Sequence, residues 1–346
     1  MRSLIERLHR EHTLAPDEFR ILLSQCNDKD LSYINALARE VSHASFGNRI
    51  FIRGLIEVGN RCKNDCYYCG IRRSNHLIER YHLDEETILA CCRHGYELGF
   101  RTFVLQGGEM NDDEMIIRTV ASIRKEFPDV AITLSLGEKE TSVYERFFQA
   151  GANRYLLRHE THNELHYRKL HPEAMSLSNR LRCLADLKRI GFQSGTGIMV
   201  GSPYQTIDNL IEDILYIENL QPEMIGIGPF LPHHDTPFAM MPSGSLNQTL
   251  LLLSIFRLMH PHALIPSTTA LATLSPEGRE KGILAGANVV MPNLSPVIQR
   301  SKYSLYDNKA SLGAEAAEGL LLLEQRLKVI GYVIDKGLSL IHISEP

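Results

Sequence analysis

Short β-rich hydrophobic runs alternate with longer amphipathic segments along most of the chain. Apolar residues that recur with helical spacing predict helices, and short apolar runs between turn signals predict strands. We expect eight strands, at residues 50–57, 102–106, 131–136, 154–158, 193–200, 224–227, 263–267 and 288–291. Because no long polar linker interrupts the alternation, the pattern predicts an α/β fold with a parallel sheet. Eight such units match a complete (β/α)8 TIM barrel.

Glycines and capping residues indicate where the helices end and begin. A glycine just past the last helical turn adopts the left-handed conformation that ends a helix. Four helices are predicted to end in this way before a new strand, at Gly99, Gly151, Gly191 and Gly286. Side chains that cap a helix N-terminus predict three helix starts, at Asp84, Thr141 and Thr206.

The remaining segments extend this barrel at both ends. Residues 1–46 predict about three helices, which we expect to cover the end of the barrel where the strands begin. The barrel itself is assigned to residues 47–312, and residues 313–346 to a last helix at 313–331 and a tail. An open doubly wound sheet uses the same alternation, but it typically carries a glycine-rich phosphate-binding turn after the first strand. Here that turn carries cysteines.

Composition narrows the functional classes. The 346 residues are 44% apolar and 23% charged, within the ordinary globular range. A net charge of −4 without a long basic run gives no electrostatic case for nucleic acid binding. No apolar stretch reaches the roughly 18 residues of a spanning helix, and no export signal is present. We therefore expect a cytoplasmic protein that binds neither nucleic acid nor membrane.

Three of the seven cysteines, Cys62, Cys66 and Cys69, follow the first strand with C-x3-C-x2-C spacing. Thiolates select iron-sulfur clusters, zinc or copper(I), and structural zinc is normally held by four protein ligands. Three cysteines therefore indicate a cluster with one iron open to another ligand. A zinc site completed by His76 or His82 is the weaker alternative, because no second ligand pair follows at the expected distance. Disulfides are also disfavoured, since the other cysteines fall in predicted helices: Cys26, Cys91, Cys92 and Cys183.

Polar residues where barrel strands end are the next candidates, because active sites of such barrels lie at that end. Gly107 and Gly108 end the second strand and permit close approach of a ligand to the backbone. Thr133 and Ser135 share one face of the third strand, and Arg158 and Glu160 share one face of the fourth. We assign both pairs to the barrel interior. Arg158 and Glu160 could bind a carboxylate and a hydroxyl or ammonium; an internal ion pair is the structural alternative.

Later strands add further candidates. Thr268 and Thr269 follow the seventh strand, where a substrate carboxylate or hydroxyl could be bound. Arg180 is a possible carboxylate receptor, although sequence alone favours a solvated charge on a helix face. His233 and His234 could suggest a metal, but flanking prolines and the lack of helical spacing favour loop residues.

From about residue 45 to 305 the chain resembles the HydE family of FeFe-hydrogenase maturases, within the radical S-adenosylmethionine (SAM) superfamily. Methylornithine synthase and, further off, biotin synthase are also similar. The stretches that carry the resemblance are Cys66-Tyr-Tyr-Cys-Gly-Ile-Arg-Arg73, Val104-Leu-Gln-Gly-Gly-Glu109, Thr133-Leu-Ser-Leu-Gly-Glu138, Arg154-Tyr-Leu-Leu-Arg-His-Glu-Thr161, Gly226-Ile-Gly-Pro-Phe-Leu-Pro232 and Ala287-Asn-Val-Val-Met-Pro-Asn293.

The resemblance implies a complete barrel of radical SAM type with one 4Fe-4S cluster and SAM near its top. It implies that Cys62, Cys66 and Cys69 hold the cluster. SAM would contact Tyr68, Gly107, Gly108, Ser135, Glu160 and Arg180. The substrate cavity would be lined by Arg53, Thr133, Arg158, Thr268, Thr269, Met291 and Tyr303.

The implied reaction is assembly of the diiron subcluster of the hydrogenase. A radical made from SAM would act on a small organometallic substrate, a cysteine-bound iron carbonyl cyanide complex. The implied partners are other maturases and an electron donor, and we expect a monomer. The alternatives are a mutase like methylornithine synthase, an enzyme like biotin synthase, and a non-enzymatic iron-sulfur scaffold or carrier.

The chain departs from the family at its C-terminus. Some members carry a second cysteine motif there, whereas Ser311, Gly319 and Leu322 lie about where those cysteines would fall. We therefore expect a single cluster. The ending at residues 338–346 resembles sequencing read-through and is given no functional weight.

Overall fold

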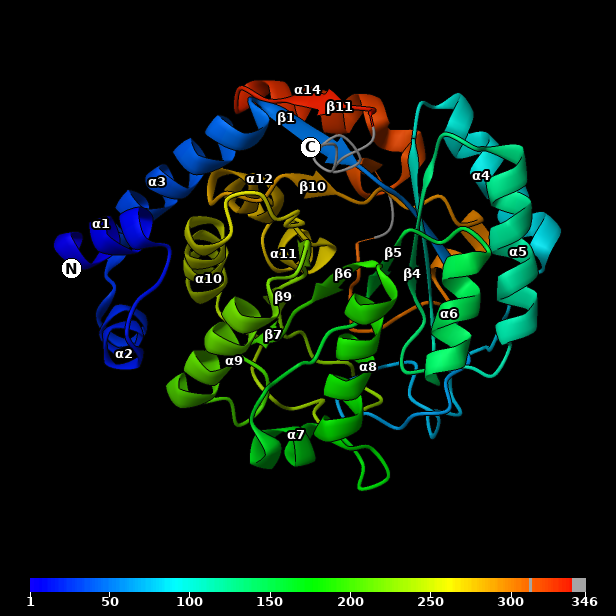
Figure 1. Cartoon of the computed structure of the whole chain (residues 1–346), viewed down its shortest axis with the longest axis horizontal. Coiled ribbons are helices and arrows are strands. Elements are labelled where there is room, and N and C mark those ends of the chain that lie inside the picture. The colour runs from blue at the N-terminus through cyan, green and yellow to red at the C-terminus, as the bar shows by residue number, and fades with distance from the viewer. Residues whose placement is uncertain (311–312, 338–346) are drawn as a thin grey trace.

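A closed ring of parallel strands forms the centre of the protein (Figure 1). The computed structural model describes residues 1–310 and 313–337. Six strands pair in the order β2-β3-β4-β5-β6-β8. Shorter pairings close the ring: Met224 pairs with Leu264, Pro266 with Val289, and β10 with β1. The strands are β1 (Arg49–Ile52), β2 (Gly54–Gly59), β3 (Thr102–Gly107), β4 (Ala131–Ser135), β5 (Arg154–Leu156), β6 (Gln193–Thr196), β8 (Met224–Ile225) and β10 (Val289–Val290).

Helices surround this ring, as the alternation in the sequence predicts. Beyond β6 and β8, two short strands, β7 (Met199–Val200) and β9 (Gly228–Pro229), pair with each other. The helices of the ring and its loops are α4 (Glu85–Glu97), α5 (Asp113–Glu126), α6 (Thr141–Gln149), α7 (Glu164–Leu170), α8 (Leu177–Ile190), α9 (Ile207–Leu220), α10 (Leu246–Met259), α11 (Thr269–Leu274), α12 (Gly278–Leu284) and α13 (Val297–Arg300). The predicted barrel is confirmed.

The predicted helix ends are confirmed, and the predicted starts are confirmed in part. Gly99, Gly151, Gly191 and Gly286 all have φ between 96° and 112°, the left-handed conformation in which a side chain is strained. Asp84 and Thr206 accept backbone N–H bonds from Thr87 and Asn209 as N-caps. Thr141 is not a cap: Glu140 precedes α6, and the Thr141 hydroxyl donates to Asp186 instead.

The N-terminal helices lie mainly beside the barrel and do not cover its end, which corrects the expectation. They are α1 (Arg2–Glu11), α2 (Pro16–Gln25) and α3 (Asp28–Phe46), and they pack against α9, α10 and α12 (Figure 1). Only the last turn of α3 reaches the barrel end. There Phe46 packs with Phe51, Met224, Leu264 and Val289.

The C-terminal region also differs from the single helix expected at 313–331. Two 3-10 turns, Gly313–Glu315 and Ala317–Gly319, precede α14 (Leu320–Val329), and a strand β11 (Val333–Asp335) pairs with β1. Ala316 bridges to Asn293, and Glu315 forms a buried ion pair with Arg279, so tertiary contacts hold this segment out of the helix. Ser311 and the tail at 338–346 lie outside the described residues. Within residues 1–310 and 313–337, no helix combines the length and apolar character needed to cross a membrane.

Candidate active site

A cavity of about 290 Å³ occupies the barrel at the end where the strands terminate. Alternate residues of each strand point inward, so Arg53, Leu55 and Glu57 face the interior at increasing distance from the start of β1. Leu55 and Leu156 line the cavity, whereas Arg53 does not. The cavity therefore begins above Arg53, at the level of these two leucines.

Most of the predicted binding residues are brought together by this cavity. It is lined by Gly107, Ser135, Arg158, Glu160, Arg180, Thr268, Thr269, Met291 and Tyr303. Two predicted substrate residues, Arg53 and Thr133, are not part of this lining. Arg53 and Thr133 are buried deeper in the barrel, where an Arg53 guanidinium nitrogen lies 3.2 Å from the Met224 sulfur. The two-residue alternation of side chains along a strand identifies which residues face the barrel interior, but not how deep in the barrel each one lies.

The cysteine loop follows β2, and Arg80 holds it in place. The Arg80 guanidinium donates to four backbone carbonyls, those of Asn60, Ile71, Arg72 and Asn75, at 2.5–2.8 Å. Multiple hydrogen bonds from one charged planar group fix a loop more firmly than neutral bonds do. Sequence reasoning missed Arg80, which has no motif of its own.

The three cysteines fit an iron-sulfur cluster better than a single zinc ion. No disulfide joins any of the seven cysteines, all of which lie within the described residues. Thiolates around one tetrahedral zinc would lie about 3.8 Å apart. The sulfur atoms of Cys62, Cys66 and Cys69 do not gather within 4.8 Å of one another. Burial raises the pKa of the Cys69 thiol to about 12, so ionisation there requires a strong positive charge such as bound iron.

The Gly-Gly-Glu stretch after β3 supports the cysteine loop directly. A Cβ on Gly108 would lie 2.1 Å from the Arg61 carbonyl oxygen, so only glycine permits this approach. Glu109 is buried and pairs with the Lys63 ammonium at 2.9 Å, and it accepts a hydrogen bond from the Asn64 amide at 3.0 Å. Gly107 faces the cavity, while Gly108 and Glu109 position the loop that carries the cysteines.

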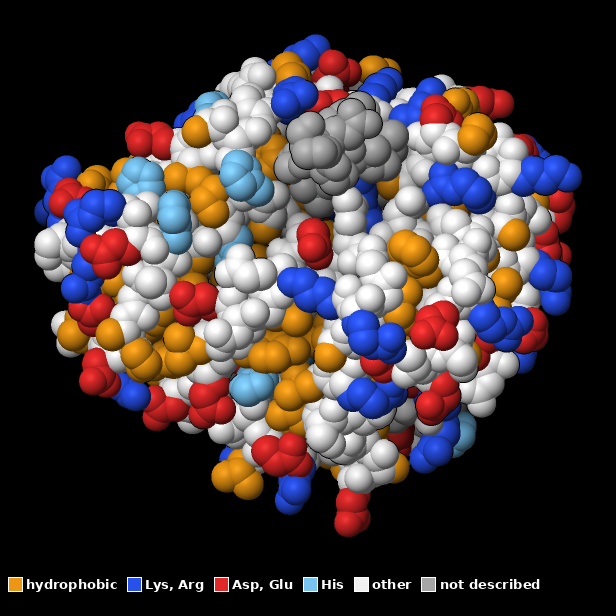
Figure 2. Space-filling model, in the orientation of Figure 1, with side chains coloured by type: hydrophobic (Ala, Val, Ile, Leu, Met, Phe, Trp, Pro, Cys, Tyr) orange, Lys and Arg blue, Asp and Glu red, His pale blue; other side chains and the backbone are white. Residues whose placement is uncertain are grey.

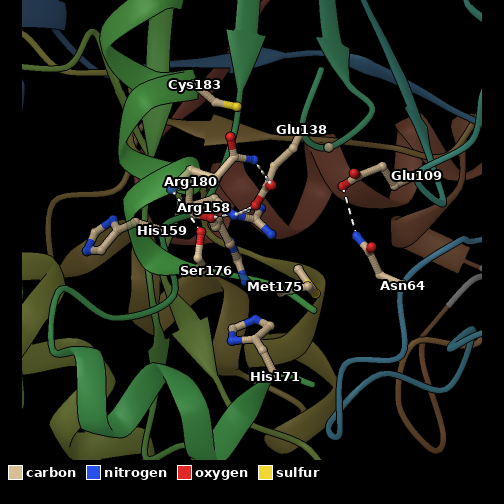
Figure 3. A network of polar contacts seen from close by, with 12 residues as sticks. Asn64, Glu109, Glu138, Arg158, His159, His171, Met175, Ser176, Arg180 and Cys183 are labelled. Atoms are coloured by element: carbon tan, nitrogen blue, oxygen red, sulfur yellow. Dashed lines mark hydrogen bonds and ion pairs between the residues drawn. The ribbon is translucent and has the colours of Figure 1, made fainter. Parts of the chain in front are cut away.

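Arg180 lies in the cavity, so the expectation of a solvated helix-face charge is wrong. It is 8% exposed, and its guanidinium pairs with Glu138 at 2.7 Å (Figure 3). Arg180 lies on the buried face of α8 with Leu177 and Leu184, and it lines the cavity.

Tyr68 lies near Arg180, between the cysteines and the cavity. Its hydroxyl is 3.1 Å from His171 Nε2, and His171 Nδ1 is 3.0 Å from the Tyr167 carbonyl oxygen. The carbonyl can only accept, so His171 donates from Nδ1 and accepts from Tyr68. Burial, with the Arg180 charge nearby, lowers the pKa of His171 to about 3. Tyr68 is thus held by a neutral histidine.

Glu160 and Arg158 point into the cavity and are not joined to each other. No Arg158–Glu160 ion pair occurs among the residues with defined positions. Glu160 has φ 65°, an uncommon backbone conformation that often marks functional sites. Burial raises the pKa of its carboxyl, and the charges of Arg158 and Arg180 oppose that effect.

The substrate end of the cavity combines predicted and unpredicted residues. Arg158 and the buried Thr268 hydroxyl face it, and the Thr268 oxygen has no hydrogen-bond partner in the described chain. Glu57 and Lys309 form an ion pair there, and Lys309 also donates to the Tyr303 carbonyl at 3.0 Å. The period of two along β2 could have indicated Glu57. Lys309 comes from a loop, and no sequence pattern pointed to it.

His233 and His234 lie outside this cavity, close to Asp307. A ring nitrogen of each histidine and a carboxylate oxygen of Asp307 all lie within 4.8 Å of one another, close enough to share a metal ion. However, His233 Nδ1 accepts the Asp235 amide at 3.1 Å, and His234 Nδ1 lies 2.6 Å from Asp307. Both rings are therefore engaged in hydrogen bonds that hold the loop, which favours the structural interpretation.

Comparisons with known proteins identify the family. The Radical SAM superfamily model matches residues 56–217. The chain is 42% identical over 311 residues to the FeFe-hydrogenase maturase subunit HydE of Thermotoga maritima, covering 89% of this chain and 88% of that one. It is 28% identical over 289 residues to 3-methylornithine synthase of Methanosarcina acetivorans, covering 82% and 81%.

Solved structures give the same fold. The crystal structure of methylornithine synthase (PylB) has a TM-score of 0.82 at 26% identity, covering 96% of this chain and 97% of that one. A crystal structure of the maturase HydG has a TM-score of 0.82 at 20% identity, covering 99% and 77%, and supports the fold alone.

The barrel, the cysteine loop and the superfamily match define a radical SAM enzyme, a class that uses a 4Fe-4S cluster and SAM. Identity across nearly the whole length takes the assignment further. The chain belongs to the HydE family of FeFe-hydrogenase maturases.

Proposed function

We propose that this enzyme acts in assembly of the diiron subcluster of FeFe-hydrogenase. Cys62, Cys66 and Cys69 would hold one 4Fe-4S cluster, and SAM would occupy the adjoining part of the cavity. When bound, the cluster supplies the electron that cleaves SAM to a 5'-deoxyadenosyl radical. The 42% identity to a curated HydE supports this pathway. Other maturases, an electron donor and a monomeric state belong to the proposal.

The residues around SAM have separate tasks in this proposal. Tyr68, Gly107, Gly108, Ser135, Glu160 and Arg180 would bind SAM. The buried carboxylate of Glu160 offers an acceptor to an ammonium or hydroxyl, and Arg180 offers a cation to a carboxylate. The roof formed by Tyr303, Leu305 and Tyr306 would exclude water from the reacting groups.

The observation that carries the substrate proposal is the guanidinium of Arg158, which lines the cavity with no hydrogen bond or ion pair to its side chain among the described residues. Thr268 adds an unpartnered hydroxyl. Together they suit a carboxylate, which a cysteine-bound iron carbonyl cyanide complex would supply. Thr269, Met291 and Tyr303 would complete this end of the cavity. Arg53 and Thr133 lie below it and would act on the substrate only indirectly.

Complementation tests the pathway. A host that carries an FeFe-hydrogenase and the other maturases, but lacks its own HydE, should regain hydrogenase activity with this gene and not with a Cys66→Ala variant. Failure of the wild-type gene to restore activity, with the protein present and loaded with iron, would contradict the proposal.

A second candidate, a methylornithine synthase-like mutase, is supported by the structural similarity to that enzyme. It predicts conversion of lysine to 3-methylornithine by reconstituted protein with SAM and a reductant. We expect no such product. A non-enzymatic carrier of iron would neither cleave SAM nor convert lysine.

A further inference from the structure

The cysteine loop lies at one end of the barrel, next to α7 (Figure 1). Tyr67 directly follows Cys66, and its backbone N–H donates to the carbonyl of Leu170, the last residue of α7, at 3.0 Å. The three cysteines are partly exposed. A protein that docks on α7 and Tyr67 would therefore approach the proposed cluster closely.

Aromatic side chains extend from Tyr67 to the surface. The Tyr67 and Phe238 rings are 6.2 Å apart, and the Phe238 and Tyr204 rings 6.1 Å. Tyr204 is 55% exposed and Met240 is 95% exposed. Leu165 on α7 is also exposed. We call these residues, Tyr67, Leu165, Tyr204, Phe238 and Met240, the aromatic patch; Phe238 is only 6% exposed and forms its buried base. Clustered apolar side chains at a surface are typical of protein interaction sites.

Basic side chains border the aromatic patch on the side of the cysteine loop, where the Arg72 guanidinium lies 5.7 Å from the centre of the Tyr67 ring. Residues 61–73 contain four basic side chains and one acidic side chain, a net of +3 in a chain whose net charge is −4. Asp65 is paired with Arg72 at 2.8 Å, and Lys63 is paired with Glu109 at 2.9 Å. Arg61 and Arg73 are the basic side chains of this segment that make no ion pair with a described residue. Lys169 on α7 lies over the Tyr204 ring at 5.2 Å. Arg73 and Lys169 are exposed and make no ion pair with any described residue.

The charge of the cysteine loop differs from that of the rest of the chain. Over the face shown in Figure 2, basic and acidic side chains are interspersed. At the cysteine loop the local sign is opposite to that of the whole chain. An acidic protein would be repelled by the chain as a whole and attracted to this area, which favours one orientation of encounter.

We propose that the aromatic patch and its basic rim form the docking surface for a small acidic protein that carries one electron. The proposal rests on the function proposed above, in which the cluster must be reduced before SAM is cleaved. In the docked complex the carrier loses one electron and the cluster gains it, and no bond or proton is transferred. Arg73 and Lys169 steer the carrier, and the patch supplies apolar contact.

The test measures electron transfer itself, so it does not depend on SAM cleavage. Reconstituted protein is mixed with a reduced acidic [2Fe-2S] ferredoxin, and reoxidation of the ferredoxin is followed by stopped flow at a wavelength where its spectrum differs from that of a 4Fe-4S cluster. The Arg73→Glu/Lys169→Glu variant should be reduced about tenfold more slowly at low salt. Added salt should slow the wild type and narrow the difference. Reduction by dithionite, which needs no docking surface, should be equal in both.

Lys125→Glu/Lys328→Glu is the matched control, since it makes the same change in net charge on α5 and α14 and should behave like the wild type. Met240→Asp, at a 95% exposed position that contributes no packing, is a second variant and should also slow reduction by ferredoxin. Equal slowing in the control would overturn the proposal, because net charge alone would then explain the effect. Unchanged ferredoxin rates in both patch variants would overturn it as well, even if they impair delivery of substrate by another maturase. Failure of SAM cleavage with dithionite would instead refute the proposed function.

Discussion

The ion pair between Glu57 and Lys309 offers a direct test of how the cavity is closed. Glu57 is fully buried on β2, and the side chain of Lys309 is 11% exposed. Lys309 reaches Glu57 from the segment that carries Tyr303 and Tyr306 across the barrel mouth. Replacing Lys309 by methionine keeps most of the volume of the side chain and removes the charge.

The two single substitutions should have unequal costs. Lys309→Met leaves a carboxylate inside the barrel without a counter-charge, and breaking a buried pair from one side costs ~3–5 kcal/mol. Glu57→Gln leaves an ammonium on a loop that can turn toward water, so the loss is nearer that of one charged hydrogen bond, ~1.5–3 kcal/mol. The double variant leaves no unpaired charge. It should be more stable than Lys309→Met alone.

Urea unfolding of anaerobically purified protein, followed by circular dichroism, gives the free energies for a double-mutant cycle. We expect a coupling energy of ~2–3 kcal/mol between Glu57 and Lys309. Additive costs, or a Lys309→Met variant as stable as the wild type, would show that Lys309 does not pair with Glu57 and that the loop is held by other contacts.

Three further predictions concern the loop and SAM binding. Arg80→Met removes donors to four carbonyls and should yield folded protein with less than the full iron content by chemical analysis. Arg93→Met, at a 42% exposed side chain on α4, should retain the full iron content. Full iron in Arg80→Met would contradict the role assigned to Arg80. Glu138→Gln leaves Arg180 unpaired and should lower the free energy of unfolding of the SAM-free protein by ~3 kcal/mol in urea unfolding. Saturating SAM should restore part of this loss. No recovery of stability with SAM would argue against SAM binding at Arg180. His171 stays neutral in the folded state, with its pKa lowered from about 6.5 to about 3. Its contribution to stability is therefore present above about pH 6.5 and is lost as pH falls toward 3. When the pH falls from 8 to 5, the free energy of unfolding should decrease by ~2 kcal/mol less in His171→Gln than in the wild type. The same pH dependence in both proteins would contradict the assignment of a neutral, buried His171.

The barrel could be predicted from the sequence because its signals are local. The glycines at 99, 151, 191 and 286 end helices through their own backbone conformation, whatever surrounds them. The cysteine spacing likewise identified a site without tertiary information. The segment after residue 313 could not be predicted in this way, because the buried Arg279–Glu315 pair and the Asn293 bridge override its helical composition.

The candidate site was predictable in direction but not in depth. Alternation along strands indicated that Arg158 and Glu160 face inward, as they do. Alternation could not show that Arg53 lies below the cavity. The lower boundary of the cavity is formed by Leu55 and Leu156, which come from different strands. Alternation also could not bring Lys309 to Glu57, since a loop far along the chain has no periodicity. Arg180 illustrates a related limit: helical spacing places it on the same face of α8 as Leu177 and Leu184, but it does not show that this part of the face opens on the cavity.

The central claim is that Cys62, Cys66 and Cys69 hold a cluster that cleaves SAM. The most direct measurement is 5'-deoxyadenosine formation by reconstituted protein with SAM and dithionite under anaerobic conditions. The account predicts 5'-deoxyadenosine and methionine in equal amounts from the wild type, with about four irons per chain, and no product from Cys66→Ala. Absence of 5'-deoxyadenosine from cluster-loaded wild-type protein, or equal formation by Cys66→Ala, would contradict it.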